Sequence, residues 1–402
     1  MNVFIIPSWY PSANSPIAGI FFKEQASYIA EMYERLNIGV SLWGQNNAQY
    51  ALNKNPFSTL KAFYNFGKNR KLTQVTPLRD NLIELFTPSL TFEWPFNVKG
   101  DNIAGMINAN FANFESYQAR YGKVDVIHAH VSYPAGYIAM ALAQQYKVPY
   151  VITEHMGPFP FEKFLLRDGG IHPKLALPLE NSSKVVAVSP KLANDITDFG
   201  FQQPVFIPNV INEDFFTPTY TPVDAPFHFF TLAMLYPEKG IDDLLEAIRI
   251  VIKNKQKVVF SIGGGGQLLQ HYKAKAKELG LEQHVDWLGE ISRSKAREMY
   301  RKCHAFVLPS HGETFGVVYA EAIACGKPVI ATRCGGPECI VDEYNGLLAE
   351  VQDPQDLAQK IFYLMENYSA FDSDRIRKGF EDKFSKRAVI PQIIEVYKSL
   401  IK

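Results

Sequence analysis

The stretch LPSHGETFGVVYAEAIACGKPVIAT, Leu308 to Thr332, holds a strand, a loop, a helix and a second strand in succession. Its apolar start stops at Pro309, a polar loop carries Glu313, and a small-residue helical pattern holds Glu321. Successive strand–helix–strand units predict parallel strands joined by right-handed crossovers. The stretch therefore predicts α/β architecture and places one carboxylate in a loop and another inside a helix.

The same alternation of apolar runs and helical patterns extends over most of the chain. Several runs are apolar on both faces, as parallel strands covered by helices are. The predicted strands of the first half are Val3–Ile6, Ile38–Trp43, Leu82–Thr87, Val124–Ala129, Val148–Thr153, Lys184–Val188 and Val205–Ile207. Those of the second half are Phe229–Ala233, Val258–Ile262, Val285–Leu288, Ala305–Leu308 and Pro328–Thr332.

A domain boundary is predicted at IPNVINEDFFTPTYTPVDAPFH, Ile207 to His228, which has four prolines and little apolar periodicity. It divides the chain into residues 1–207 and 208–383, each a complete Rossmann-like, doubly wound parallel-sheet domain. Ligands of such sheets bind beyond the carboxyl ends of the strands. We therefore expect the two domains to face each other across a cleft that holds a small ligand.

Composition excludes several classes of protein. The 402 residues carry 41 basic and 41 acidic side chains, which gives no reason to expect nucleic acid as a partner. The four cysteines all follow residue 300 without CxxC spacing, which is typical of buried structural thiols in a reducing compartment. The first apolar run is shorter than the core of a signal peptide, and no run reaches the ~20 residues of a membrane span. We expect a cytoplasmic protein.

The spacing of the two glutamates indicates an extended ligand. A helix over Gly316–Cys325 would point unpaired N–H groups at the loop, and such ends favour phosphate. If all helical, Glu313 and Glu321 would lie ~12 Å apart along the axis. This exceeds the ~5–9.5 Å of a glycosidase carboxylate pair. Two polyol groups with a diphosphate between them fit better.

The segment PSHGETFGVVYAEAIACGKPVIATRCGGPECIVDEYNGLL resembles the donor-binding segment of family 4 retaining glycosyltransferases, which have the GT-B fold. Their E-x7-E motif falls on Glu313 and Glu321, and the continuation matches Gly335, Gly336, Glu338, Asn345 and Gly346. The resemblance implies that Glu313 binds hydroxyls of the donor sugar and Glu321 the nucleotide ribose. It implies donor contacts at the helix start, from Thr314, Phe315, Gly316 and Val317.

A second segment, LAMLYPEKGIDDLLEAI, is similar to the G-R-L-x-x-x-K-G pattern of the same family. Lys239 and Gly240 match, and the resemblance assigns Lys239 to the diphosphate. The expected glycine and arginine are replaced by Ala233 and Met234. One charge-assisted contact, worth roughly 1.5–3 kcal/mol, is therefore missing from the pattern.

The resemblance also implies roles for weaker motifs. The glycine run at Gly263 and Gly264 would lie near the nucleotide, and Trp287 and Leu288 would meet the base through their backbone. Gly19, in a loop before an amphipathic helix, would approach the diphosphate and acceptor. The segment 384–402 resembles the family helix that crosses back to the first domain.

Three histidines follow or end strands of the first domain. His130 ends a strand where a cleft would open, and the resemblance places a histidine there beside the donor sugar. His128 is expected to be a packed core residue, and for His155 a structural and a functional role are equally supported. The His–x–His spacing has no evident third ligand, so we expect no metal.

The segment Tyr50 to Gln74 mixes basic and aromatic residues. One interpretation is contact with an anionic membrane surface. The favoured one is a solvated helix with its aromatic face in the core.

We expect a metal-independent glycosyltransferase without a cofactor. It would move a sugar from a nucleotide-diphosphate sugar, with retention, to a saccharide or lipid-linked acceptor. Peripheral contact with the inner face of a membrane is part of this expectation. A nucleotide-sugar epimerase of the same fold and a non-catalytic nucleotide-sugar-binding paralogue remain alternatives, the latter because of Met234.

Overall fold

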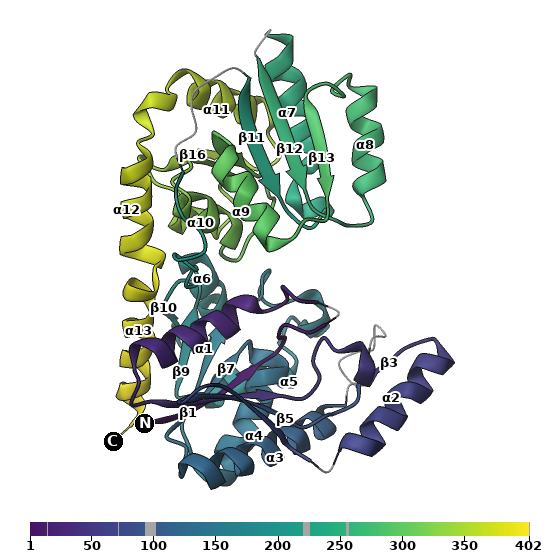
Figure 1. Ribbon diagram of the computed structural model, residues 1–402, viewed down its shortest axis with the longest axis vertical. Helices are drawn as coiled ribbons and strands as arrows, with labels where there is room; N and C mark the ends of the chain where they lie inside the picture. The colour runs from purple at the N-terminus through teal and green to yellow at the C-terminus, as the bar shows by residue number, and fades with distance from the viewer. Residues whose placement is uncertain (14, 71, 93–101, 220–225, 255–256, 402) are drawn as a thin grey trace. The chain divides into compact units, whose positions relative to one another are not determined.

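The computed structural model describes residues 1–13, 15–70, 72–92, 102–219, 226–254 and 257–401 (Figure 1). The chain folds into two compact units. The N-terminal unit contains residues 1–188, 193–207 and 390–402, and the C-terminal unit contains residues 189–192 and 208–389. Residues 220–225 of the predicted boundary segment lie outside the described residues.

The N-terminal unit is built on an eight-stranded sheet of described residues, in the order β10-β9-β8-β7-β1-β2-β5-β4. Its pairings are parallel except that of β4 with β5, which is antiparallel. The strands are β1 (Asn2–Pro7), β2 (Asn37–Leu42), β4 (Gln74–Arg79), β5 (Leu82–Phe86), β7 (Val126–His130), β8 (Tyr150–Glu154), β9 (Lys184–Ala187) and β10 (Val205–Phe206). A small parallel pair is formed by β3 (Ala51–Leu52) and β6 (Thr91–Phe92).

Helices cover both faces of this sheet, with α1 on one side and α3 and α4 on the other (Figure 1). Every residue of β7 and β8 is consequently buried. The helices are α1 (Ile20–Met32), α2 (Pro56–Asn69), α3 (Ile103–Tyr121), α4 (Tyr137–Tyr146), α5 (Pro173–Asn181) and α6 (Pro190–Asp198). Short helical turns are η1 (Ala48–Tyr50), η3 (Ser132–Gly136) and η4 (Glu162–Phe164).

The C-terminal unit has a six-stranded, all-parallel sheet of described residues, in the order β13-β12-β11-β14-β15-β16. The strands are β11 (Phe227–Leu232), β12 (Val258–Gly263), β13 (Val285–Gly289), β14 (Ala305–Val307), β15 (Val329–Thr332) and β16 (Gly346–Ala349). The helices are α7 (Ile241–Lys253), α8 (Leu269–Glu278), α9 (Arg293–Lys302), α10 (Val317–Ala324), α11 (Pro354–Glu366) and α12 (Ser373–Phe384). Helix α13 (Lys386–Leu400) begins in this unit, and its residues from Ile390 onward belong to the N-terminal unit. Short turns are η5 (Pro237–Lys239), η6 (Pro337–Cys339) and η7 (Tyr368–Ala370).

The predicted fold class is confirmed, because each unit is a twisted α/β sheet with crossover helices. All twelve predicted strands are present, and four further strands were not predicted: β3, β4, β6 and β16. The residues of β4 are all exposed and include a proline, so β4 lacks the apolar signal of a buried strand. Among the described helices, none is long and apolar enough to cross a bilayer.

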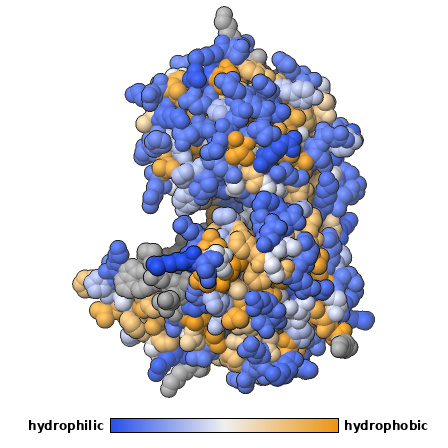
Figure 2. All heavy atoms as spheres, turned by 180° about the vertical axis from the view of Figure 1, so that it is seen from behind, coloured by the Kyte–Doolittle hydropathy of each residue, from blue (hydrophilic) through white to orange (hydrophobic). Residues whose placement is uncertain are grey.

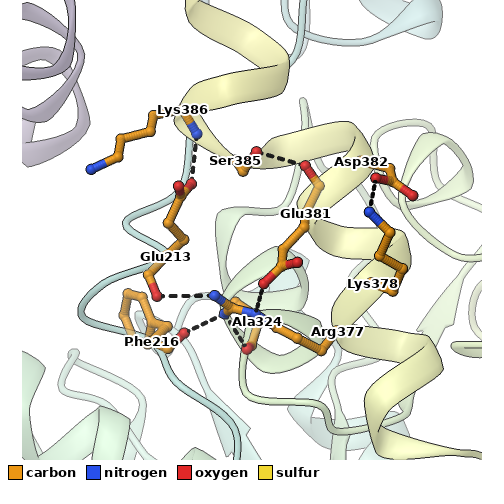
Figure 3. Close-up of polar contacts among 9 residues, drawn as sticks. All are labelled: Glu213, Phe216, Ala324, Arg377, Lys378, Glu381, Asp382, Ser385 and Lys386. Carbon is orange, nitrogen blue, oxygen red and sulfur yellow. Dashed lines mark hydrogen bonds and ion pairs between the residues drawn. The ribbon is translucent and has the colours of Figure 1, made fainter. Parts of the chain in front are cut away.

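Arg377 of α12 connects the start of the C-terminal unit, at Phe216, to the end of α10, at Ala324, through hydrogen bonds (Figure 3). Its Nη1 donates at 2.7 Å to the carbonyl oxygens of Phe216 and Ala324, and its Nη2 donates to that of Glu213 at 3.2 Å. Its Nε also donates to Glu381 at 2.7 Å. Ala324 is the last residue of α10, so the cation satisfies a free carbonyl at the negative end of that helix.

Replacing Arg377 by alanine should lower the free energy of unfolding by about 3 kcal/mol, because three backbone acceptors lose a charged donor. Urea denaturation followed by far-ultraviolet circular dichroism measures this. Arg333→Ala is the control, since Arg333 makes an exposed ion pair with Glu350 and should cost less than about 1 kcal/mol. Equal midpoints for the two variants would contradict the role of Arg377.

Candidate functional site

The C-terminal sheet has its topological switch point between β11 and β14. Strands β12 and β13 continue the sheet on one side of this point, and β15 and β16 on the other. Loops that leave the carboxyl ends of two such strands diverge, and ligands of doubly wound sheets bind there. The loops after β11 and β14 carry Lys239 and Glu313, so the sheet order places both residues at one switch point.

Glu313 is held by two donors at this point. Lys239 Nζ lies 2.7 Å from Glu313 Oε1 and forms an ion pair with it. Ser310 Oγ donates to the same oxygen at 2.9 Å. The side chains of Lys239 and Glu313 are 21% and 14% exposed, so the pair is largely removed from water while part of each group remains accessible. In the structure, Lys239, which is predicted to contact the diphosphate, is therefore paired with Glu313, which is predicted to contact the donor sugar.

Backbone and side-chain contacts connect the loop after β14 to the loop after β11 and to the start of α7. The His311 amide donates to the carbonyl of Glu238 at 2.7 Å, and His311 Nε2 lies 2.6 Å from Asp243 Oδ2. Gly240 has φ 63°, and a Cβ there would lie 1.9 Å from the carbonyl oxygen of Pro309. Only glycine permits this approach. The two residues of the Lys239–Gly240 dipeptide therefore have different roles. Gly240 permits the two loops to approach each other, and Lys239 forms the ion pair with Glu313.

Glu321 projects from α10 and is held from a neighbouring helix. The helix begins at Val317, one residue after the predicted start, with Gly316 as its N-cap at φ 93°. Tyr300 of α9 donates its hydroxyl to Glu321 Oε2 at 3.1 Å. Burial, followed by the charge of Glu321, raises the pKa of Tyr300 well above its usual value, so Tyr300 remains a neutral donor. No local motif indicates this contact, because it joins residues 21 positions apart on different helices.

The glycine-rich continuation of the motif supports the Glu313 loop. Gly336 N donates to the carbonyl of Glu313 at 2.8 Å, and a Cβ on Gly336 would lie 2.6 Å from the Phe315 amide. Asn345 closes the following turn, because its side chain accepts from Asp342 N and donates to Ile340 O, both at 2.9 Å. Gly336 therefore supports the Glu313 loop, and Asn345 stabilises the turn that leads to β16.

The remaining predicted donor residues lie in the same unit. Gly264 has φ 139°, and a Cβ there would lie 1.8 Å from the carbonyl oxygen of Ala233, so the glycine run is pressed against the loop after β11. Met234 in that loop is 49% exposed. The others are Gly263, buried at the end of β12; Trp287 and Leu288, half-buried on edge strand β13; Thr314 and Val317, half-buried; and Phe315, buried. Their donor contacts stay predictions.

The N-terminal sheet has its own switch point, between β1 and β7. Gly19 lies in the loop after β1, as the N-cap of α1, with φ 66°. A Cβ there would lie 2.6 Å from the carbonyl oxygen of Trp9, so the end of the loop packs closely against its beginning. His130 is the last residue of β7. Both predicted residues of this unit therefore flank its switch point.

His130 is fully buried there, although the sequence placed it at an opening. Its Nδ1 lies 3.2 Å from His155 Nε2, its Nε2 lies 3.5 Å from Gln25 Nε2, and its ring stacks on Phe22 at 4.4 Å between centroids. Burial, with smaller effects of His128 and His155, holds the pKa of His130 well below its usual value. The ring is consequently neutral near pH 7.

His128 is a core residue, as predicted. Its Nδ1 and Nε2 lie 2.6 Å from the Tyr397 hydroxyl and 2.8 Å from Thr153 Oγ1. Burial lowers the pKa of His128 to about 3. Tyr397 belongs to the part of α13 that is included in the N-terminal unit, so His128 anchors the C-terminal helix.

Glu154 is a buried carboxylate that no sequence motif singled out. It ends β8 and accepts from the backbone amides of Ser132, His155 and Met156 at 2.8–2.9 Å, as well as from the Ser132 hydroxyl. Burial raises the pKa of Glu154, and these hydrogen bonds oppose the rise. The feature of the sequence that could have identified Glu154 is its position at the end of a predicted strand, next to His155.

The described residues contain no group of three or more His, Cys, Asp or Glu side chains arranged to hold a metal ion. Asp243 and His311 form a pair only, and Asp242 pairs with Lys275 at 2.7 Å. At the C-terminal switch point the described residues supply the Lys239–Glu313 ion pair and the amino end of α10.

Known proteins are similar in sequence to both units of this chain. Residues 217–381 match the family of group 1 glycosyl transferases, and residues 98–215 match glycosyltransferase family 4. An uncharacterized glycosyltransferase of Methanocaldococcus jannaschii is 33% identical over 279 residues, which are 69% of this chain and 76% of that protein. A D-inositol 3-phosphate glycosyltransferase of Xylanimonas cellulosilytica is 29% identical over 263 residues, 58% of this chain and 61% of that protein.

Solved structures share the fold. Sucrose-phosphate synthase from Thermosynechococcus elongatus superimposes with a TM-score of 0.76 at 20% identity, covering 100% of this chain and 99% of that one. The Anabaena protein HepE, solved with UDP and glucose, gives 0.65 at 19% identity, covering 99% of this chain and 100% of that one. The chain belongs to the group 1, family 4 glycosyltransferases of GT-B fold, which take their sugar from a nucleotide-sugar donor.

Proposed function

We propose that this chain transfers a sugar from a nucleotide-diphosphate sugar to an acceptor hydroxyl with retention of configuration and without an obligatory metal. The supporting observation is the Lys239–Glu313 ion pair at the C-terminal switch point, beside the amino end of α10. Glu313 offers acceptors for sugar hydroxyls, Lys239 offers charge for a diphosphate, and Glu321 offers acceptors for a ribose. This set agrees with the family motifs in the same positions.

The proposed chemistry is front-face substitution. The bond between the anomeric carbon and the leaving phosphate oxygen breaks while the acceptor oxygen forms its bond on the same face. The acceptor proton passes to the leaving phosphate oxygen, so no side chain has to act as a base. The reaction then depends on stabilising charge on the phosphate, which Lys239 and the free amides at the start of α10 supply.

The N-terminal unit is proposed to hold the acceptor, a glycan or a lipid-linked saccharide. For the donor, UDP-sugars are the first choice to test, since the HepE structures contain UDP or UDP-glucose. Met234 supports a second candidate, a non-catalytic nucleotide-sugar-binding protein. It stands in place of the family arginine and is 49% exposed, so the diphosphate lacks one cation of the usual pattern.

A donor screen separates the candidates. Purified chain is mixed with each of several nucleotide sugars, and thermal shift identifies those that bind, because a ligand of the folded state raises the melting temperature. The binding donor is then incubated with and without a mixed saccharide and lipid-linked acceptor fraction, with and without EDTA. Transfer that needs acceptor and survives EDTA supports the proposal. Donor isomerisation without acceptor indicates an epimerase, and binding without turnover indicates the non-catalytic protein.

Replacing Glu321 by alanine should weaken binding of the nucleoside diphosphate about 10- to 100-fold, since a ribose hydroxyl pair loses a charged acceptor. Tyr300→Phe should weaken it less, because the carboxylate stays and loses only its orienting donor. Calorimetry with the free nucleotide measures both. Glu366→Ala, at the exposed end of α11, is the control. Unchanged affinity in Glu321→Ala would refute the ribose role.

A further inference from the structure

Helix α2 presents its apolar residues to solvent. Phe57 is 82% exposed, Leu60 66%, Phe63 50% and Tyr64 70%. Within α2, all of which lies in the described part of the chain, Ala62 is the buried residue. The favoured sequence interpretation, with the aromatic face in the core, is therefore wrong. Figure 2 shows hydrophobic residues exposed at the edge of the N-terminal unit that α2 occupies in Figure 1.

Basic side chains share this outer face. Phe57, Lys61, Tyr64 and Lys68 follow one another at intervals of three and four residues, so they form one stripe along the helix. Lys54 and Arg70, which flank the helix, are also exposed. None of these four cations makes an ion pair with a described residue. Lys71 lies outside the described residues.

The sequence on both sides of α2 has no acidic residues over a long stretch. From residue 35 to residue 79 the chain has seven Lys or Arg residues and no Asp or Glu. The rest of the chain must then carry 34 basic and 41 acidic side chains, from totals of 41 and 41, so positive charge is concentrated here. An exposed apolar helix face that carries cations is the pattern of a helix that lies in the interface of an anionic bilayer.

We propose that the outer face of α2, defined by Phe57, Leu60, Lys61, Tyr64 and Lys68, docks onto an anionic lipid membrane. The rings would enter the headgroup region, and the lysines would pair with lipid phosphates. A second copy of this chain fits poorly, because a symmetric contact would set lysine against lysine. A soluble polyanion would engage the cations and leave Phe57 and Leu60 in water.

Vesicle sedimentation tests the proposal without donor or acceptor, so its outcome is independent of the proposed function. The wild-type chain should sediment with phosphatidylcholine vesicles that contain about 30 mol% phosphatidylglycerol, and not with pure phosphatidylcholine. Phe57→Ser with Tyr64→Ser should lower the partition coefficient by about tenfold or more. Lys61→Glu with Lys68→Glu should lower it by at least about fivefold per residue, and about 0.5 M NaCl should weaken wild-type binding.

Matched controls lie on the C-terminal unit. Tyr363→Ser removes a 53% exposed aromatic from α11, and Lys273→Glu reverses an exposed charge on α8. Both should bind vesicles as the wild type does, and circular dichroism should show that every variant is folded.

Three outcomes overturn the proposal. The first is a wild type that does not bind the anionic vesicles. The second is full binding by the aromatic variant, which would show charge adsorption alone. The third is a change from dimer to monomer in that variant by sedimentation velocity, which would assign the face to a second copy.

Discussion

Replacing Glu313 by glutamine should leave binding of the nucleoside diphosphate intact and lower sugar transfer by about two orders of magnitude. The carboxylate is proposed to hold donor-sugar hydroxyls, and glutamine keeps the size of the side chain without its charge. Lys239 Nζ, now 2.7 Å from Glu313 Oε1, would face a neutral acceptor in place of a carboxylate and remain available to the diphosphate. Calorimetry with the nucleotide and a product assay with the intact donor separate the two effects.

Two further variants make this result specific. Ser310→Ala removes one neutral donor to Glu313 and should reduce transfer only a few-fold. Glu246→Gln breaks an ion pair with Arg249 on α7, with both side chains about one-third exposed, and should change neither measurement. Transfer at the wild-type rate in Glu313→Gln would refute its assignment to the sugar. Loss of nucleotide binding together with a lower melting temperature would show that the ion pair holds the loops together instead.

The strand pattern of both sheets could be predicted because buried parallel strands are apolar on both faces. Strands β7 and β8 are buried along their whole length, and their apolar runs are unambiguous. Strand β4 escaped prediction because it is an exposed antiparallel edge strand whose residues carry no burial signal. Strand β16 is four residues long, and its approach to β15 depends on Gly346, where a Cβ would lie 2.3 Å from the Val329 carbonyl oxygen.

The candidate site was predictable where a motif is local and not where partners come from distant elements. Glu313, Gly316 and Glu321 lie within one loop and helix, so their spacing could be interpreted directly. The partners Tyr300 and Asp243 lie on α9 and α7, and only the folded sheet brings them to Glu321 and His311. The pairing of Lys239 with Glu313, 74 positions apart, likewise follows from the order of β11 and β14.

Helix α2 shows a different limit of prediction from the sequence, which concerns what covers an apolar helix face. Its periodicity identifies an apolar face, but periodicity does not determine whether that face meets protein or solvent. In the structure α2 packs on η1 and β3, small elements at the edge of the unit, and buries Ala62 against them. The aromatic side chains are left outside because these elements are too small to cover them.

Substitutions of the two histidines of β7 should have different effects: replacing His128 should lower stability, and replacing His130 should lower the rate of sugar transfer. His128→Ala removes two buried hydrogen bonds, to Tyr397 and Thr153, and should lower the free energy of unfolding by about 3 kcal/mol. The pKa of His128 is about 3 in the folded state and near 6.5 in the unfolded chain. Between these values the unfolded chain binds the extra proton, so wild-type stability should fall with pH below about 6.5, by up to about 1.4 kcal/mol per pH unit from this residue. His128→Ala should show a shallower fall.

His130 needs a different measurement, because it is as deeply buried as His128 and its replacement by alanine also creates a cavity. We expect His130→Ala to lower the transfer rate of folded enzyme about 10- to 100-fold while binding of the sugar-free nucleotide stays nearly intact. His130→Gln keeps a hydrogen-bonding side chain near Gln25 and His155 and should restore the melting temperature more than the rate. Melting temperature and rate, measured on all three variants, decide the matter. If His130→Ala only destabilises, or if His128→Ala abolishes transfer in a stable fold, the role in transfer does not belong to His130.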